Sequence, residues 1–171
     1  MKKTFLLLSF VFVLIACESA EKSLSPESIT TIYLIRHAEK DRSDKENKNP
    51  ELTDQGKRRA ERWAEVLGLS KIDAVYSTNY QRTLQTAAPT ATGNGLEIQI
   101  YEPNNLDIDS LAALHQGERI LIVGHSNTTP MLVNRALGEE RFEWIKDTVN
   151  GNLFVLTITP SARGVQVLSI E

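Results

Sequence analysis

The alternation of strand patterns with helix patterns is the feature of this sequence that most restricts its fold. Short runs of apolar and β-branched residues predict four strands, at residues 31–35, 73–77, 96–101 and 119–124. A helical pattern follows each of them. Strand–helix–strand units form parallel sheets through right-handed crossovers, with helices on both faces of the sheet. The sequence therefore predicts an α/β fold, a three-layer α/β/α sandwich with a mostly parallel sheet.

The clearest helix is predicted at residues 52–68. There Ala60, Trp63, Ala64 and Leu67 recur at the i, i+3, i+4, i+7 spacing of an amphipathic helix. Thr53 is the expected N-cap, Gly68 the expected stop and Trp63 a core residue. The other helices are predicted at residues 81–92, 110–115 and 127–138.

The end of the chain departs from this rhythm. Apolar runs at residues 152–159 and 165–171 flank the turn-like segment PSARG. They predict a C-terminal hairpin, with one strand antiparallel at the edge of the sheet.

The first residues have the pattern of a secretory signal, with two lysines before an apolar stretch. That stretch, residues 5–16, is shorter than the roughly 20 residues of a membrane-spanning helix. Its end, LIAC, resembles the bacterial lipobox, which implies cleavage before Cys17 and lipidation of Cys17. The alternative is an ordinary cysteine beside a signal cut. We expect a signal peptide (1–16), a lipidated cysteine and polar tether (17–28), and one exported domain (29–171) held at a membrane of the cell envelope.

Charge and cysteine content exclude other classes of protein. The chain has 22 acidic and 19 basic side chains, a net charge of −3, and so lacks the basic surplus of a nucleic-acid-binding protein. Cys17 is the sole cysteine, which leaves the domain without an internal disulfide. Its stability must come from an apolar core.

Candidate site residues stand where three predicted strands end. Two of the three histidines, His37 and His125, follow strands directly; Arg36 precedes the first, and Arg82 follows the second strand closely. The carboxyl ends of parallel strands form the usual ligand edge of such sheets. Arginine offers a planar fork of donors for phosphate oxygens, and a neutral histidine can be a nucleophile. This set of residues predicts a phosphoryl-binding site, supported by the start of the helix near residues 128–130.

These segments, in this order, resemble the histidine phosphatase superfamily, which has the phosphoglycerate-mutase-like fold. The resemblance rests on YLIRHAEK, LTDQG, STNYQRTLQTA and VGHSNT, and extends from residue 30 to about 138. It implies that His37 is the nucleophile that becomes phosphohistidine. It also implies that Arg36 and Arg82 clamp the phosphate and that His125 contacts the same oxygens. No metal or cofactor is implied, and the expected partner is a small phosphorylated substrate.

The acid that protonates the leaving group is not fixed by the sequence. By resemblance it follows the third strand, where Glu102 is the first candidate, Asp107 the second, and Glu39 beside the nucleophile the third. Without a placed acid, substrates with good leaving groups, such as phosphohistidine or phosphoanhydrides, are favoured.

Other polar residues have two readings each. Thr83 and Ser126 are expected to contact phosphate or to serve as caps, and His115 to be a surface or helix-capping residue. Arg42 and Lys45 lie in the polar loop 39–51, beside the site.

Two functions remain open at this point. The first is a metal-independent phosphatase, and the alternative is a non-catalytic lipoprotein that binds a phosphorylated ligand in the same pocket. A mutase is disfavoured because this chain is short and lacks cap segments.

Overall fold

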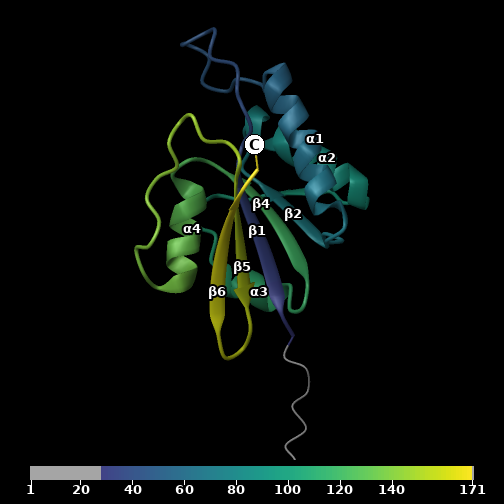
Figure 1. Ribbon diagram of the computed structural model, residues 1–171, viewed down its shortest axis with the longest axis vertical. Coiled ribbons are helices and arrows are strands. Elements are labelled where there is room, and N and C mark those ends of the chain that lie inside the picture. Colours follow the sequence, from purple (N-terminus) through teal and green to yellow (C-terminus); the bar gives the residue numbers. More distant parts are fainter. Residues whose placement is uncertain (1–27, 171) are drawn as a thin grey trace, which may run out of the picture.

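A six-stranded sheet forms the centre of the computed structural model, which describes residues 28–170 (Figure 1). Its strands are β1 (Thr30–Arg36), β2 (Ala74–Ser77), β3 (Ile98–Ile100), β4 (Arg119–Gly124), β5 (Asn152–Ile158) and β6 (Arg163–Ser169). The helices are α1 (Asp54–Gly68), α2 (Gln81–Asn94), α3 (Ile108–Leu114) and α4 (Thr128–Leu137). The strand order is β3-β2-β4-β1-β5-β6, and β1 to β4 are parallel.

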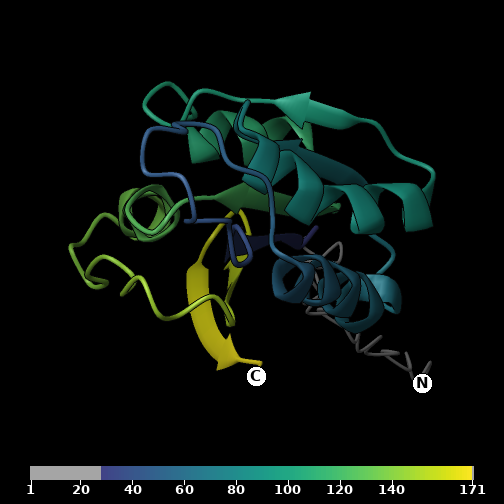
Figure 2. The same ribbon diagram turned by 90° about the horizontal axis from the view of Figure 1, so that it is seen from above.

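The helices cover both faces of the sheet (Figure 2). Because side chains alternate along a strand, Ile35 of β1 packs in the cluster that holds Trp63 of α1 and Ala87 of α2. Its neighbour Leu34 packs in the opposite cluster, with residues of α3 and α4 such as Leu132. Trp63 is buried as expected. The predicted three-layer sandwich with a mostly parallel sheet is confirmed.

The C-terminal hairpin is also present. β5 lies antiparallel to β1, and β6 pairs antiparallel to β5 and forms the edge of the sheet. The hairpin therefore extends the parallel sheet by two strands, and β5 is the one that runs opposite to β1–β4.

The first turn of α1 lies against the chain that leaves β1. Thr53 caps α1 as predicted, since its hydroxyl accepts a hydrogen bond from the backbone N–H of Gly56. A Cβ at position 56 would collide with the carbonyl oxygen of Glu39, so the residue there must be glycine. This close approach fixes the segment that carries His37 against α1.

Two ends of the sheet can now be distinguished. The start of β1 lies at the lower end of the sheet in Figure 1, while Arg36 ends β1 at the opposite end. Among residues 28–170, no helix is long and apolar enough to cross a bilayer. The expected signal peptide, Cys17 and most of the tether lie outside the described residues.

Candidate active site

A cavity of about 450 Å³ opens at the carboxyl ends of the parallel strands. The sequence-predicted residues Arg36, His37, Arg82, His125 and Glu102 all line it. Arg36 ends β1 and His37 follows it, Arg82 lies in the first turn of α2, and His125 follows β4. The structure thus brings together residues that are up to 89 positions apart.

His37 is buried and held in one tautomer. Its Nδ1 lies 2.7 Å from the carbonyl oxygen of Ala38, and because a carbonyl only accepts, Nδ1 carries the proton. Nε2 is then left with its lone pair. Burial lowers the pKa of His37 to about 3, and the nearby charge of Arg36 acts in the same direction. His37 is therefore neutral at neutral pH, the form required of a nucleophile.

The guanidinium of Arg36 is held by hydrogen bonds to the segment between α4 and β5. Its Nη1 donates to the carbonyls of Lys146 (2.9 Å) and Val149 (3.0 Å), and Nη2 donates to Asp147 (2.9 Å). Nε is buried and has no hydrogen-bond partner among the described residues. The arginine is thus fixed in place with one donor still to be satisfied.

Arg82 has more donors without a hydrogen-bond partner than Arg36 does. Its Nε and Nη1 are buried without a hydrogen-bond partner in the described part of the chain. The guanidinium lies 4.3 Å from the ring centroid of Tyr80, and burial lowers its pKa from the usual value. A buried donor without a hydrogen-bond partner destabilises a fold by about 1–3 kcal/mol, and by more when it is charged. These groups therefore favour an anion in the cavity.

His125 is oriented by a chain of hydroxyl groups. The Thr83 hydroxyl donates to the Thr78 carbonyl (2.8 Å) and therefore accepts from the Thr78 hydroxyl (3.0 Å). The Thr78 proton is thereby used, so the 3.0 Å contact with Nε2 of His125 requires the histidine to donate. Burial, helped by Arg82, lowers the pKa of His125 to about 4. Its ring centroid lies 5.6 Å from that of His37.

A comparison with protein-family models identifies a family with a similar sequence. The model of the histidine phosphatase superfamily (branch 1) matches residues 32–103, the part of the chain that carries Arg36, His37 and Arg82. Residues 32–103 are therefore similar to that superfamily. A comparison with curated protein sequences gave no significant match.

Solved structures similar to this chain share its fold at low identity. Bacillus stearothermophilus YhfR is 17% identical, with a TM-score of 0.67 over 83% of this chain and 98% of that one. The putative phosphohistidine phosphatase SixA of Agrobacterium tumefaciens is 21% identical (TM-score 0.60, 82% and 98%). A mutant phosphoserine phosphatase of Entamoeba histolytica, in complex with phosphoserine, is 16% identical (TM-score 0.62, 80% and 95%). The likeness confirms the phosphoglycerate-mutase-like fold class.

The candidate acids of this site differ in what they contact. Glu102 lines the cavity and is exposed. Asp107 instead caps α3, where its carboxylate accepts from the backbone N–H (3.0 Å) and hydroxyl (2.6 Å) of Ser110. Glu39 pairs with Arg59 at 2.8 Å. Of these three carboxylates, Glu102 is the one without such a competing role.

Among the charged residues that line the cavity, sequence reasoning missed Lys40 and Asp147. Both lie in segments without helical or strand periodicity, so no pattern placed their side chains. A weak signal existed for Lys40, which lies in the polar loop already assigned to the edge of the site.

The remaining predicted residues have defined places. Ser126 lines the cavity, whereas the hydroxyl of Thr83 is used in the chain that holds His125. His115 is the C-cap of α3, and its ring contacts Tyr76 (2.8 Å) and Glu118 (2.6 Å). Arg42 forms an ion pair with Asp147 at 3.4 Å. Lys45 lines neither the cavity around His37, nor the one that adjoins it, nor the one beside Thr30.

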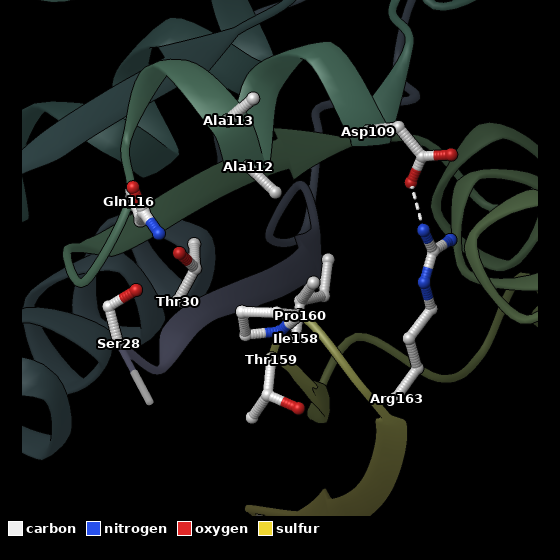
Figure 3. A pocket seen from close by; sticks show the side chains of 10 residues that line it. All are labelled: Ser28, Thr30, Asp109, Ala112, Ala113, Gln116, Ile158, Thr159, Pro160 and Arg163. Atoms are coloured by element: carbon white, nitrogen blue, oxygen red, sulfur yellow. Dashed lines mark ion pairs between the residues drawn. The ribbon is translucent and has the colours of Figure 1, made fainter. Parts of the chain in front are cut away.

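A different cavity, of about 250 Å³, lies at the opposite edge of the sheet beside Thr30 and Ile158 (Figure 3). The arginine that lines it, Arg163, pairs with Asp109 at 2.5 Å and donates to the carbonyl of Ala136 at 2.7 Å. Because the guanidinium of Arg163 already has these partners, this cavity differs from the site around His37, where arginine donors are left without partners. Among residues 28–170, no cluster of three or more His, Cys, Asp or Glu could hold a metal ion.

Proposed function

We propose that this protein is a metal-independent phosphatase that works through a phosphohistidine on His37. The observation that carries the proposal is a neutral, oriented histidine beside buried arginine donors that lack partners, at Nε of Arg36 and at Nε and Nη1 of Arg82. A phosphoryl group would satisfy these donors. The match of residues 32–103 to the model of the histidine phosphatase superfamily supports the same reading.

The proposed reaction has two displacements. Nε2 of His37 attacks phosphorus, the bond to the leaving oxygen breaks, and Glu102 gives that oxygen a proton. Water then attacks the phosphohistidine, Glu102 takes the proton of the water, and inorganic phosphate leaves with His37 restored. The arginines stabilise the charge that spreads over the equatorial oxygens in both steps.

His125 has a supporting role in this scheme. Its Nε2 proton is committed to Thr78, so it can donate to a phosphate oxygen only through its other ring nitrogen. A bound phosphoryl dianion would favour protonation there, because it opposes the effect of burial on the pKa.

The first experiment measures hydrolysis of p-nitrophenyl phosphate and phosphohistidine by the purified full-length chain. Turnover should fall about 10³-fold or more in His37→Ala, and a chelator should leave the wild-type rate unchanged. Hydrolysis that survives in His37→Ala would refute the phosphohistidine route.

A second candidate function follows from the exposure of Glu102. If this carboxylate does not serve as the acid, the same pocket suits a non-catalytic protein that binds a phosphorylated ligand. Binding of inorganic phosphate without turnover of any ester or phosphohistidine would support this alternative.

We also propose that the domain is exported and held at the cell envelope by a lipid on Cys17. The support is the sequence alone, namely Lys2 and Lys3, the apolar stretch at residues 5–16 and the LIAC ending. Expressed in a bacterium fed an alkyne-labelled fatty acid, the wild-type chain should carry label in the membrane fraction. Label that persists in Cys17→Ser would exclude this anchor.

A further inference from the structure

A second cavity adjoins the one around His37. It has a volume of about 290 Å³. It shares three lining residues, His37, Lys40 and Asp147, with the cavity of about 450 Å³ around His37, here called the phosphate cavity. Arg42 lines the second cavity only. The two cavities therefore adjoin each other at a shared wall, which includes His37 and Lys40.

Lys40 is a cation without a partner at this shared wall. In the described part of the chain its ammonium group forms no hydrogen bond and no ion pair. Its main charged neighbours include Arg82, Arg42 and Arg36, all of the same sign, and together with burial they lower the pKa of Lys40. The acid that acts on it, Asp147, already pairs with Arg36 at 2.9 Å and with Arg42 at 3.4 Å.

The transferred phosphoryl group does not by itself account for Lys40. Arg36 offers Nε and Arg82 offers Nε and Nη1, so the equatorial oxygens already have three unpartnered arginine donors. Leaving Lys40 partly buried among three arginines is unfavourable unless a second anion arrives with the substrate.

We propose that Lys40, together with Arg42, binds a second anionic group of the substrate in the adjoining cavity. The substrate class is then a small phosphorylated molecule whose leaving group carries a carboxylate or another phosphate, rather than a plain phosphomonoester. A cavity of about 290 Å³ admits only a compact group of this kind. This inference rests on the proposed phosphatase function and narrows its substrate.

The test compares phenyl phosphate with 3- and 4-carboxyphenyl phosphate, which differ by one carboxylate on the leaving group. The wild-type chain should hydrolyse at least one of the carboxylated esters with about tenfold higher kcat/KM than phenyl phosphate. In Lys40→Met this preference should shrink about tenfold. Lys45→Met is the matched control, since it removes a lysine from the same loop that lines neither cavity, and its preference should equal that of the wild type.

Two outcomes would overturn the inference. One is the absence of any preference for a carboxylated ester in the wild type. The other is an equal loss of kcat/KM on all three esters in Lys40→Met, which would place Lys40 on the transferred phosphoryl group. Failure of the phosphatase proposal itself would look different, because phenyl phosphate hydrolysis would then be absent or would survive in His37→Ala.

Discussion

At the residue scale, the Asp147 carboxylate is a group in the lining of the site whose charge opposes an incoming phosphate. Nη1 of Arg36 is already held by two backbone carbonyls, so the guanidinium should keep its place without the charge of Asp147. Asp147→Asn, which retains an acceptor oxygen, should tighten binding of inorganic phosphate about two- to fivefold, a modest gain because water screens this exposed side chain. Calorimetry at low ionic strength measures the gain, which should fade in roughly 1 M salt.

The matched control at this scale is Glu143→Gln. Glu143 is an exposed acid in the same segment and does not line the phosphate cavity, so its variant should bind phosphate as the wild type does. Weaker binding in Asp147→Asn would contradict the argument, because it would mean that the charge of Asp147 is needed to hold Arg36.

How far the sequence predicted the site also depends on single residues. Arg36, His37 and His125 could be placed because each stands at the end of an apolar strand, and Arg82 because it opens a helix directly after one. Asp147 could not be placed, since its position depends on hydrogen bonds between Arg36 and a segment with no periodicity of its own.

At the element scale, the structure follows the predicted strands and helices and differs mainly at their ends. β3 is shorter than the predicted strand because the N–H of Leu96 bonds to the carbonyl of Ala91, at the end of α2. α2 continues beyond the predicted residue 92 until Gly95, whose φ of +67° lets it close the helix. α3 begins earlier than predicted, directly after the Asp107 cap. These ends are set by caps and hydrogen bonds, which apolar periodicity does not encode.

The segment between α4 and β5 is the element that sequence patterns left undefined. It has no helix or strand, yet it ties the site together in the upper left of Figure 1. Asn150 donates to the carbonyl of His37 (2.9 Å), and the N–H of Ile145 donates to the carbonyl of Ser126 (2.8 Å). The segment thus contacts the chain beside both strand ends that carry a site histidine, while its own residues grip Arg36.

At the scale of the whole molecule, the site and the start of the described domain lie at opposite edges of the sheet. Ser28 precedes the amino end of β1, whereas His37 follows its carboxyl end. If the proposed lipid holds Cys17 at a membrane, the chain joins the domain at the edge away from the phosphate cavity. This arrangement suits a substrate that arrives from water, in agreement with a small doubly anionic molecule.

His37, which is buried, and His125, which is partly buried, make the stability of the whole domain depend on pH. The pKa is about 3 for folded His37 and about 4 for folded His125, against an ordinary value of 6.5. Between about pH 6.5 and 4 the unfolded chain therefore binds more protons than the folded one, and the free energy of unfolding falls as the pH falls. The slope from each histidine approaches about 1.4 kcal/mol per pH unit once the unfolded form is mostly protonated.

Urea unfolding at pH 6.5, 5.8 and 5.0 measures this dependence, at or above the pH of about 5 below which aspartates with a lowered pKa, such as Asp147, begin to contribute. His37→Gln and His125→Gln should each reduce the slope by about half, and the double variant should nearly abolish it, because neither substitution leaves a group that can take up the proton. The comparison within the series separates titration from any loss of packing, since lost packing lowers stability equally at every pH. An unchanged slope in both single variants would mean that these histidines are not the source of the dependence. A free energy of unfolding of the wild type that rises as the pH falls would contradict the neutral state of these histidines, and with it the assignment of His37 as a nucleophile ready to act at neutral pH.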